Sequence, residues 1–255
     1  MNPESRARPG TLVVTGAGRG IGAATARLAG ARGYAVAVNY AHDRESAERV
    51  VTDIVASGGR ALAIAADVAV EAEVIDLFAR AQRALGPLTG LVNNAGITGG
   101  FARVADLSSE VLARTLAVNV AGAFLCSREA VRRLARSRGG AGGAIVNVSS
   151  RAAALGGGGE WVHYAASKGA VDTLTRGLAN EVAAEGIRVN AVAPGLIDTG
   201  IHAAAGRPER LERLTPGVPL ARAGTPDEVA EAILWLLSPA AAYVTGTVLA
   251  VSGGR

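Results

Sequence analysis

The stretch Thr11-Leu-Val-Val-Thr-Gly-Ala-Gly-Arg-Gly-Ile-Gly22 decides the fold. Its first five residues are the apolar run of a buried strand, and the glycines that follow predict a tight turn before a helix over 20–31. Glycines let the backbone approach a phosphate closely, and the start of a helix offers it free N–H groups. In this strand–turn–helix setting, the pattern predicts a dinucleotide site that includes Gly16, Gly18, Arg19, Gly20, Ile21 and Gly22.

The same alternation of short apolar runs and helical stretches continues to the end of the chain. Further strands are expected at 35–40, 61–66, 88–96, 143–150, 187–195 and 247–253. Further helices are expected at 43–57, 70–85, 108–137, 164–185 and 226–237, the last with Thr225 as its N-cap. Such apolar strands indicate burial on both faces. The pattern therefore predicts an α/β fold: a doubly wound, Rossmann-type, parallel seven-stranded sheet with helices on both faces.

We expect this fold to occupy residues 1–255 as a single domain, because no linker divides the chain. Residues 1–10 are polar and are expected to be flexible. Segment 196–224 lacks periodicity, and we expect it to be a substrate loop near the carboxyl ends of the strands, where such folds bind ligands.

The end of the second strand bears on the choice between NADP and NAD. No carboxylate stands at the strand tip, Asn39-Tyr40, to bind a ribose 2′-hydroxyl. Arg19, His42 and Arg44 are cations that could meet a 2′-phosphate, whereas Asp43 is explained as the N-cap of the next helix. NADP(H) is therefore favoured over NAD(H), with Asn39 and Tyr40 as further contacts.

After the third strand, Asp67 has two readings that the sequence leaves equal. It contacts the adenine amine together with its neighbour Val68, or it caps the following helix.

Tyr164 and Lys168 stand at positions i and i+4, which share one face of a helix. A tyrosine ordinarily ionises near pH ~10, too high for proton transfer at neutral pH, and a nearby ammonium lowers that pKa. Lys168 is the only lysine among 26 basic residues, so the chain keeps one compact ammonium at this place. The pair predicts an acid/base site, with Lys168 also able to hold ribose hydroxyls.

Several motifs share an order and an approximate spacing with one known family. They are TGAGRGIG, the Asn93-Asn94-Ala95-Gly96 turn, Asn119, Ser149-Ser150, YAASK at 164–168 and Pro194-Gly195. From about residue 10 to the C-terminus the chain resembles the short-chain dehydrogenase/reductase family. One interval departs from the family's commonest pattern, because Ser150 and Tyr164 are one residue further apart. We expect the glycine run 156–159 to absorb that residue.

The resemblance implies a role for each matching residue. Tyr164 is the acid/base, Lys168 assists it and binds the nicotinamide ribose, and Ser150 hydrogen-bonds the substrate oxygen. Asn119 anchors a proton-relay water, although by sequence alone a satisfied buried amide is an equal reading. Two further sets line the nucleotide: Asn93, Ala95 and Gly96 beside the adenine ribose, and Pro194, Gly195, Ile197 and Thr199 around the carboxamide.

The expected function is NADP(H)-dependent interconversion of a carbonyl and a secondary alcohol by hydride transfer. The alternatives are an NAD(H)-dependent sugar dehydrogenase on the same fold and a non-catalytic nucleotide-binding regulator. The pocket loops 97–105, 155–163 and 196–215 set the choice of substrate but name no ligand.

Five residues of these loops have alternative interpretations. Trp161 and His163 either line the pocket or pack against the protein. Arg207, Arg210 and Arg213 are interpreted as a solvated helix face rather than a site for acidic substrates.

Partners and location follow from composition. Cys126 is the single cysteine, the first ten residues hold no signal peptide, and no apolar run is judged long enough to span a bilayer. We therefore expect a cytoplasmic protein without membrane or nucleic-acid partners, despite a net charge of +4. His42, His163 and His202 are too scattered for a zinc site, so no metal is expected. The family's closing strand, resembled by YVTGTVLAVSGG, implies a homotetramer, with a dimer as the alternative.

Overall fold

The computed structural model describes residues 9–200 and 206–255. The expectation of flexibility for residues 1–10 falls almost entirely outside this range, as do His202 and the middle of the expected substrate loop.

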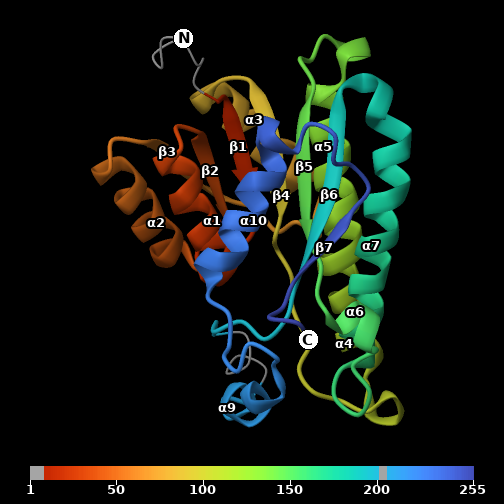
Figure 1. Cartoon of the computed structure of the whole chain (residues 1–255). Coiled ribbons are helices and arrows are strands. Elements are labelled where there is room, and N and C mark those ends of the chain that lie inside the picture. Colours follow the sequence, from red (N-terminus) through yellow and green to blue (C-terminus); the bar gives the residue numbers. More distant parts are fainter. Residues whose placement is uncertain (1–8, 201–205) are drawn as a thin grey trace.

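Seven parallel strands form one sheet, in the order β3-β2-β1-β4-β5-β6-β7 (Figure 1). The strands are β1 (Thr11–Val14), β2 (Ala35–Tyr40), β3 (Arg60–Ala65), β4 (Leu88–Asn93), β5 (Gly143–Val148), β6 (Ile187–Pro194) and β7 (Val248–Val251). The predicted doubly wound fold is confirmed, and every strand lies inside or within one residue of its expected range.

Helices cover both faces of the sheet (Figure 1). The first face carries α1 (Gly20–Ala31), α2 (Arg44–Ala56) and α10 (Pro226–Leu237). The second face carries α3 (Glu71–Leu85), α5 (Gly122–Leu134) and α7 (Val162–Val182). Shorter helices lie beyond the strands: α4 (Ser109–Leu116), α6 (Ala152–Leu155) and α9 (Arg210–Leu214).

The two cores follow from the alternation of side chains along each strand. Val13 of β1 packs in one buried cluster with Phe78 and Ile145, whereas its neighbours Leu12 and Val14 belong to a second cluster on the opposite face. Continuous apolar strands are therefore required, because both faces of each central strand are buried.

The strand order reverses between β1 and β4, which places a crevice at their carboxyl ends. Figure 1 shows α4, α6 and α9 at this end of the sheet, together with the start of α7. The helix α6 was not predicted, because it is too short to show a helical period, whereas α9 was expected only as the helix face that carries Arg207, Arg210 and Arg213.

The helix expected over 108–137 is interrupted by a π-helical turn, Ala117–Ala121, between α4 and α5. Asn119 lies in this turn, and its side-chain amide bonds the backbone of Ile97 through both its oxygen and its nitrogen, at 2.8 Å each. Wide turns of this kind often occur at functional sites. No periodicity argument detects one, because the pattern of apolar residues continues through it.

The predicted helix caps have mixed outcomes. Asp43 accepts a hydrogen bond from the backbone N–H of Ser46, and Thr225 forms a capping box with Glu228, as expected. Asp67 does not cap α3, because a turn follows it and the helix begins only after Val70. Its capping interpretation was therefore wrong.

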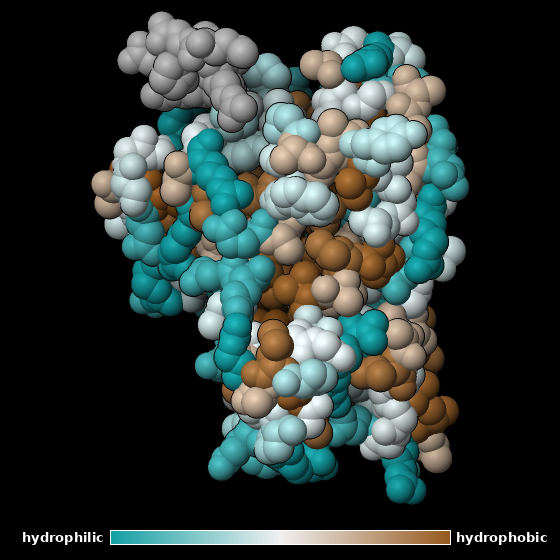
Figure 2. Space-filling model, in the orientation of Figure 1, coloured by the Kyte–Doolittle hydropathy of each residue, from teal (hydrophilic) through white to brown (hydrophobic). Residues whose placement is uncertain are grey.

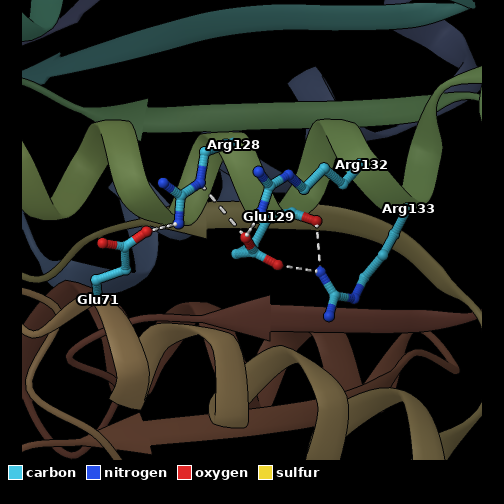
Figure 3. Close-up of polar contacts among 5 residues, drawn as sticks. All are labelled: Glu71, Arg128, Glu129, Arg132 and Arg133. Atoms are coloured by element: carbon cyan, nitrogen blue, oxygen red, sulfur yellow. Dashed lines mark hydrogen bonds and ion pairs between the residues drawn. The ribbon is translucent and has the colours of Figure 1, made fainter.

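A buried carboxylate, Glu129, lies on α5 among three arginines (Figure 3). Its oxygens bond Arg132 at 2.7 Å and Arg133 at 2.6 Å, and Arg128 lies 3.4 Å away while reaching Glu71 on α3 at 2.7 Å. Burial alone raises the pKa of Glu129, but the bonds and charges of Arg133 and Arg132 outweigh it and hold that pKa below its ordinary value. This cluster connects α3 with α5, away from the crevice.

One helical stretch among the described residues, Ser109–Leu134, is apolar and long enough to cross a membrane by length and composition alone. In this fold α5 packs on α3 and β4, and core helices of soluble proteins pass the same test.

Candidate active site

A cavity opens at the carboxyl ends of the strands, between the glycine turn, the start of α7 and the segment after β6. It brings together residues that lie far apart in the sequence. Those among the predicted site residues that line it are Ile21, Gly96, Ser150, Tyr164, Lys168, Pro194, Gly195, Ile197 and Thr199.

The glycine turn is built so tightly that side chains are excluded. A Cβ on Gly22 would lie 2.4 Å from the amide nitrogen of Asn94 and 2.5 Å from the carbonyl oxygen of Gly16. Gly16 itself has φ +60°, and a Cβ there would lie 2.9 Å from Ala95. The turn therefore presents bare backbone and the start of α1, where Arg19 provides no side-chain cap, to the crevice.

Two residues predicted to contact the nucleotide, Asn39 and Asn93, instead use their side chains to hydrogen-bond the protein. Asn39 accepts a hydrogen bond from the N–H of Gly16 at 3.1 Å and donates to the carbonyl of Ala66 at 2.9 Å. Asn93 is buried, and its amide donates to Ser127 and Asn147 in the core. Its side chain is thus turned away from the cavity, and only its backbone could contact a nucleotide.

The neighbouring Asn94 has the position expected of a site residue, which the sequence reading missed. It lines the cavity, and its amide donates to the carbonyls of Thr15 and Gly16 at 2.9 Å. The signal was present, because an amide in a turn after a central strand can hold the facing glycine turn.

Ser150 and Tyr164 both line the cavity, and the Ser150 side chain lies close enough to the phenol to lower its pKa by hydrogen bonding. The hydroxyl of Ser149 instead donates to the backbone carbonyl of Lys168 at 3.3 Å and anchors α7. The helix α6 and the glycine run 156–159 separate the two serines from Tyr164 in the sequence. Gly156, Gly157 and Gly159 have positive φ. This loop can accommodate the one extra residue between Ser150 and Tyr164.

The pKa values of the pair differ from the expectation. Burial raises the pKa of the Tyr164 phenol, and the Ser150 hydrogen bond and the charge of Arg210 act against that rise. Burial also lowers the pKa of Lys168 to about 8, although Asp172 raises it. The amine donates to the carbonyl of Val148 at 2.7 Å and lies 5.8 Å from the Tyr164 ring centre. The expected lowering of the phenol pKa by Lys168 is therefore wrong for this arrangement, because desolvation dominates.

Asn119 lies behind Lys168. A Cβ on Gly96 would lie 3.3 Å both from the Asn119 amide oxygen and from the Lys168 amine, so these two groups flank the same glycine. The Asn119 amide also donates to Ser167 at 2.9 Å. Asn119 is therefore a satisfied buried amide. Its position beside the Lys168 amine is also compatible with the other interpretation, in which it anchors a proton-relay water.

At the second strand, the capping bond of Asp43 occupies its carboxylate, and Arg44 pairs with Glu48 at 3.4 Å. Arg19 is exposed, and its charge acts on Asp43. Asp67 is bound by Arg114 of α4 at 2.7 Å. These groups follow the carboxyl ends of β1, β2 and β3, with Tyr40 at the end of β2 and Val68 packed against Gly122.

Among the histidines of the described chain, His163 is buried, and its ring nitrogen bonds the carbonyl oxygen of Thr98 at 2.8 Å. Within residues 9–200 and 206–255, no group of three or more histidine, cysteine or acidic side chains could hold a metal ion.

Comparison with known proteins adds to this geometry. Residues 16–255 match a family model described as enoyl-(acyl carrier protein) reductase. The uncharacterized oxidoreductase YgfF of Escherichia coli (strain K12) is 51% identical over 243 residues, which are 95% of this chain and 98% of that protein. Versicolorin reductase 1 of Aspergillus parasiticus is 39% identical over 265 residues, covering 100% and 99%. A solved mutant of the Serratia marcescens short-chain dehydrogenase/reductase has a TM-score of 0.88 at 34% identity, covering 97% of this chain and 98% of that one.

The chain belongs to the short-chain dehydrogenase/reductase family. The resemblance inferred from the motifs is confirmed. As a short-chain dehydrogenase/reductase, the protein is an NAD(P)-dependent oxidoreductase that acts on alcohols and carbonyls.

In this short-chain dehydrogenase/reductase, one arginine lies where the sequence did not place it. Arg210 was interpreted as part of a solvated helix face, yet it is 8% exposed and lines the cavity. The interpretation was wrong because α9 folds back over the strand ends. Arg207 and Arg213, by contrast, are exposed as expected.

Proposed function

We propose that the protein interconverts a carbonyl and a secondary alcohol with NADP(H), and that Tyr164 transfers the proton. The observation that carries this proposal is the meeting of Ser150 and Tyr164 within a cavity that Lys168 and the segment after β6 also line. The two hydroxyls are donors that can converge on one substrate oxygen, where charge develops during reduction.

The residues present fit a dinucleotide, because the turn at Gly16 and Gly22 leaves no room for side chains and exposes the start of α1. The nicotinamide, when bound, supplies or accepts the hydride. Tyr164 donates the proton to the substrate oxygen, and Ser150 holds that oxygen by a hydrogen bond. Lys168 would hold the ribose hydroxyls of the bound nucleotide, and Asn119 positions a water beside its amine.

The test is Tyr164→Phe, which removes the hydroxyl and keeps the ring. We expect kcat for NADPH-dependent reduction to fall by about 10²- to 10⁴-fold, the range of a general acid, with nucleotide binding by fluorescence titration unchanged. Ser149→Ala is the matched control, because this hydroxyl bonds the backbone of α7 and not the phenol. Full activity in Tyr164→Phe would return the non-catalytic regulator to first place.

The preference for NADP(H) is supported by the exposed Arg19 and by a capping bond that occupies Asp43. A guanidinium pairs well with a phosphate, and each charged hydrogen bond contributes about 1.5–3 kcal/mol. We expect Arg19→Ala to raise KM for NADPH by about tenfold and to leave KM for NADH unchanged. A wild-type preference for NADH would contradict the cofactor assignment and favour the NAD(H)-dependent sugar dehydrogenase.

A homotetramer is supported by two apolar surfaces. Figure 2 shows apolar side chains gathered over the middle of the face in view, where the edge strand β7 lies between α10 and α7. A groove between α5 and α7 is lined by Leu125, Val131, Leu174 and Leu178, and Phe124 beside them is 52% exposed. Apolar patches of this kind mark protein interfaces. Light scattering of the purified protein should give a mass four times that of the chain, and a monomer would contradict this assignment.

A further inference from the structure

Three loops meet at one indole beside the cavity. Phe101 stacks on Trp161 with ring centres 4.7 Å apart and planes at 16°. The guanidinium of Arg210 lies 4.4 Å from the Trp161 ring centre. The backbone joins two of these loops as well, because Ala102 donates to the carbonyl of Glu160 at 2.9 Å. Residues from each of the three loops expected to set the substrate thus pack together: Phe101 and Ala102, Glu160 and Trp161, and Arg210.

An ion pair connects this unit to α9. One carboxylate oxygen of Glu160 accepts from Arg210 through Nε at 3.1 Å and Nη2 at 2.8 Å. The other oxygen accepts from Arg213 at 3.2 Å. The Arg210 side chain is 9% exposed, whereas that of Arg213 is 55% exposed. Arg210 therefore makes the desolvated contact and Arg213 the solvated one, to the same carboxylate.

This cluster touches the proton-transfer residue. The Trp161 and Tyr164 rings lie 5.3 Å apart, tilted by 50°, and both line the cavity with Arg210. Arg210 is also the charged side chain whose field acts on the Tyr164 phenol. A displacement of Arg210 would therefore loosen the indole that packs against that ring.

We propose that Arg210 is a positioning residue. Through its ion pair with Glu160 and its stacking on Trp161, it holds α9 against the cavity wall beside Tyr164 and sets how tightly the carbonyl substrate is bound.

The physical basis is the difference between buried and exposed pairs. A guanidinium removed from water and then deprived of its carboxylate cannot remain in place without a large free-energy cost. An exposed pair contributes little, because water replaces the partner. Arginine both stacks on an indole and donates two N–H bonds from its planar group, here to one oxygen of Glu160, so lysine would fulfil only part of the role.

The direct test uses Trp161 as a reporter. The chain has two tryptophans, and Trp235→Phe on α10 leaves Trp161 as the only one. In that background we expect Glu160→Gln to increase acrylamide quenching of Trp161 fluorescence severalfold, and Arg213→Gln to leave it unchanged. This measurement requires no turnover, so it remains decisive if the proposed function fails. Unchanged quenching in Glu160→Gln would overturn the inference.

The kinetic test rests on the proposed function. We expect Glu160→Gln and Arg210→Gln to raise KM for the carbonyl by about tenfold, equivalent to one charged hydrogen bond, with kcat within about twofold. Arg210→Lys should restore part of that loss, and Arg213→Gln should change KM by less than about twofold. Increased quenching with unchanged KM would overturn the positioning role. Tyr164→Phe, which lowers kcat instead of raising KM, separates the two proposals.

Discussion

Glu129 and Glu160 are each bound by more than one arginine, but the buried partner is the carboxylate in the first cluster and an arginine in the second. Glu129 is itself buried, at 4% side-chain exposure, while Arg132 is 51% exposed. Glu160 is 31% exposed, while its partner Arg210 is 9% exposed. In the first cluster the arginines compensate the buried charge of Glu129. In the second cluster the carboxylate of Glu160 compensates the buried charge of Arg210.

The comparison teaches that the buried member decides what an ion pair does. Glu129 lies between α3 and α5, so its arginines neutralise a charge inside the protein and support stability (Figure 3). Arg210 lies at the cavity, so Glu160 keeps a cation in place where substrate binds. Removing Glu129 should therefore change unfolding, and removing Glu160 should change KM.

The largest expected effect is that of Glu129→Gln. It leaves three guanidinium groups without their shared anion, and we expect the free energy of unfolding to fall by about 3 kcal/mol. Urea denaturation measures this change. KM for carbonyl and nucleotide should be unchanged in the folded variant, because the cluster does not line the cavity. An altered KM with normal stability would contradict the distinction between the two clusters.

The same carboxylate predicts a dependence on pH. Its arginines hold the pKa of Glu129 below the ordinary 4.5, so its contribution to stability is complete above that pH. As pH falls below 4.5 towards the folded-state pKa, the carboxylate protonates and the contribution is lost. Denaturation across this range should show the difference between the protein and Glu129→Gln shrinking as pH falls. A constant difference down to acid would contradict this account.

A smaller effect is expected from Gly157→Ala at the second cluster. Gly157 has φ +63°, and a Cβ there would lie 2.7 Å from the Trp161 ring. Gly156 has φ +78° and nothing within 4 Å of its Cβ position, so Gly156→Ala is a matched control for backbone strain. Backbone strain should cost each variant about 1 kcal/mol of stability, and Gly157→Ala should lose more than that, because its Cβ would also lie 2.9 Å from the carbonyl oxygen of Trp161. Only Gly157→Ala should raise the KM for the carbonyl, and equal KM values in both would contradict the importance of the Trp161 position.

The smallest effects are expected where the two clusters are alike. Arg132 and Arg213 are both about half exposed and both bind the carboxylate of their cluster. Arg132→Gln and Arg213→Gln should each change the free energy of unfolding by less than about 1 kcal/mol, because water replaces such a partner. Thermal melts at low and high salt measure this. A larger loss in either would show that exposure does not separate the strong contacts from the weak ones.

The glycine turn and the alternating elements were predictable from local pattern, because strand, turn and helix there form from adjacent residues. Asn93 and Arg210 were not. The core role of Asn93 depends on Asn147, 54 positions away, and the burial of Arg210 depends on α9 returning to Glu160, 50 positions away. The π turn at Asn119 was missed for the same reason, since its bonds reach Ile97 across 22 positions.

By itself, the sequence determined the seven strands, their parallel, doubly wound arrangement and the motifs that place this chain in its family, because periodicity and glycine spacing act over short range. The tertiary structure alone decided which side chains face the cavity, Arg210 among them. It also decided that burial raises the phenol pKa, because desolvation depends on everything packed around a group and not on its neighbours in the chain.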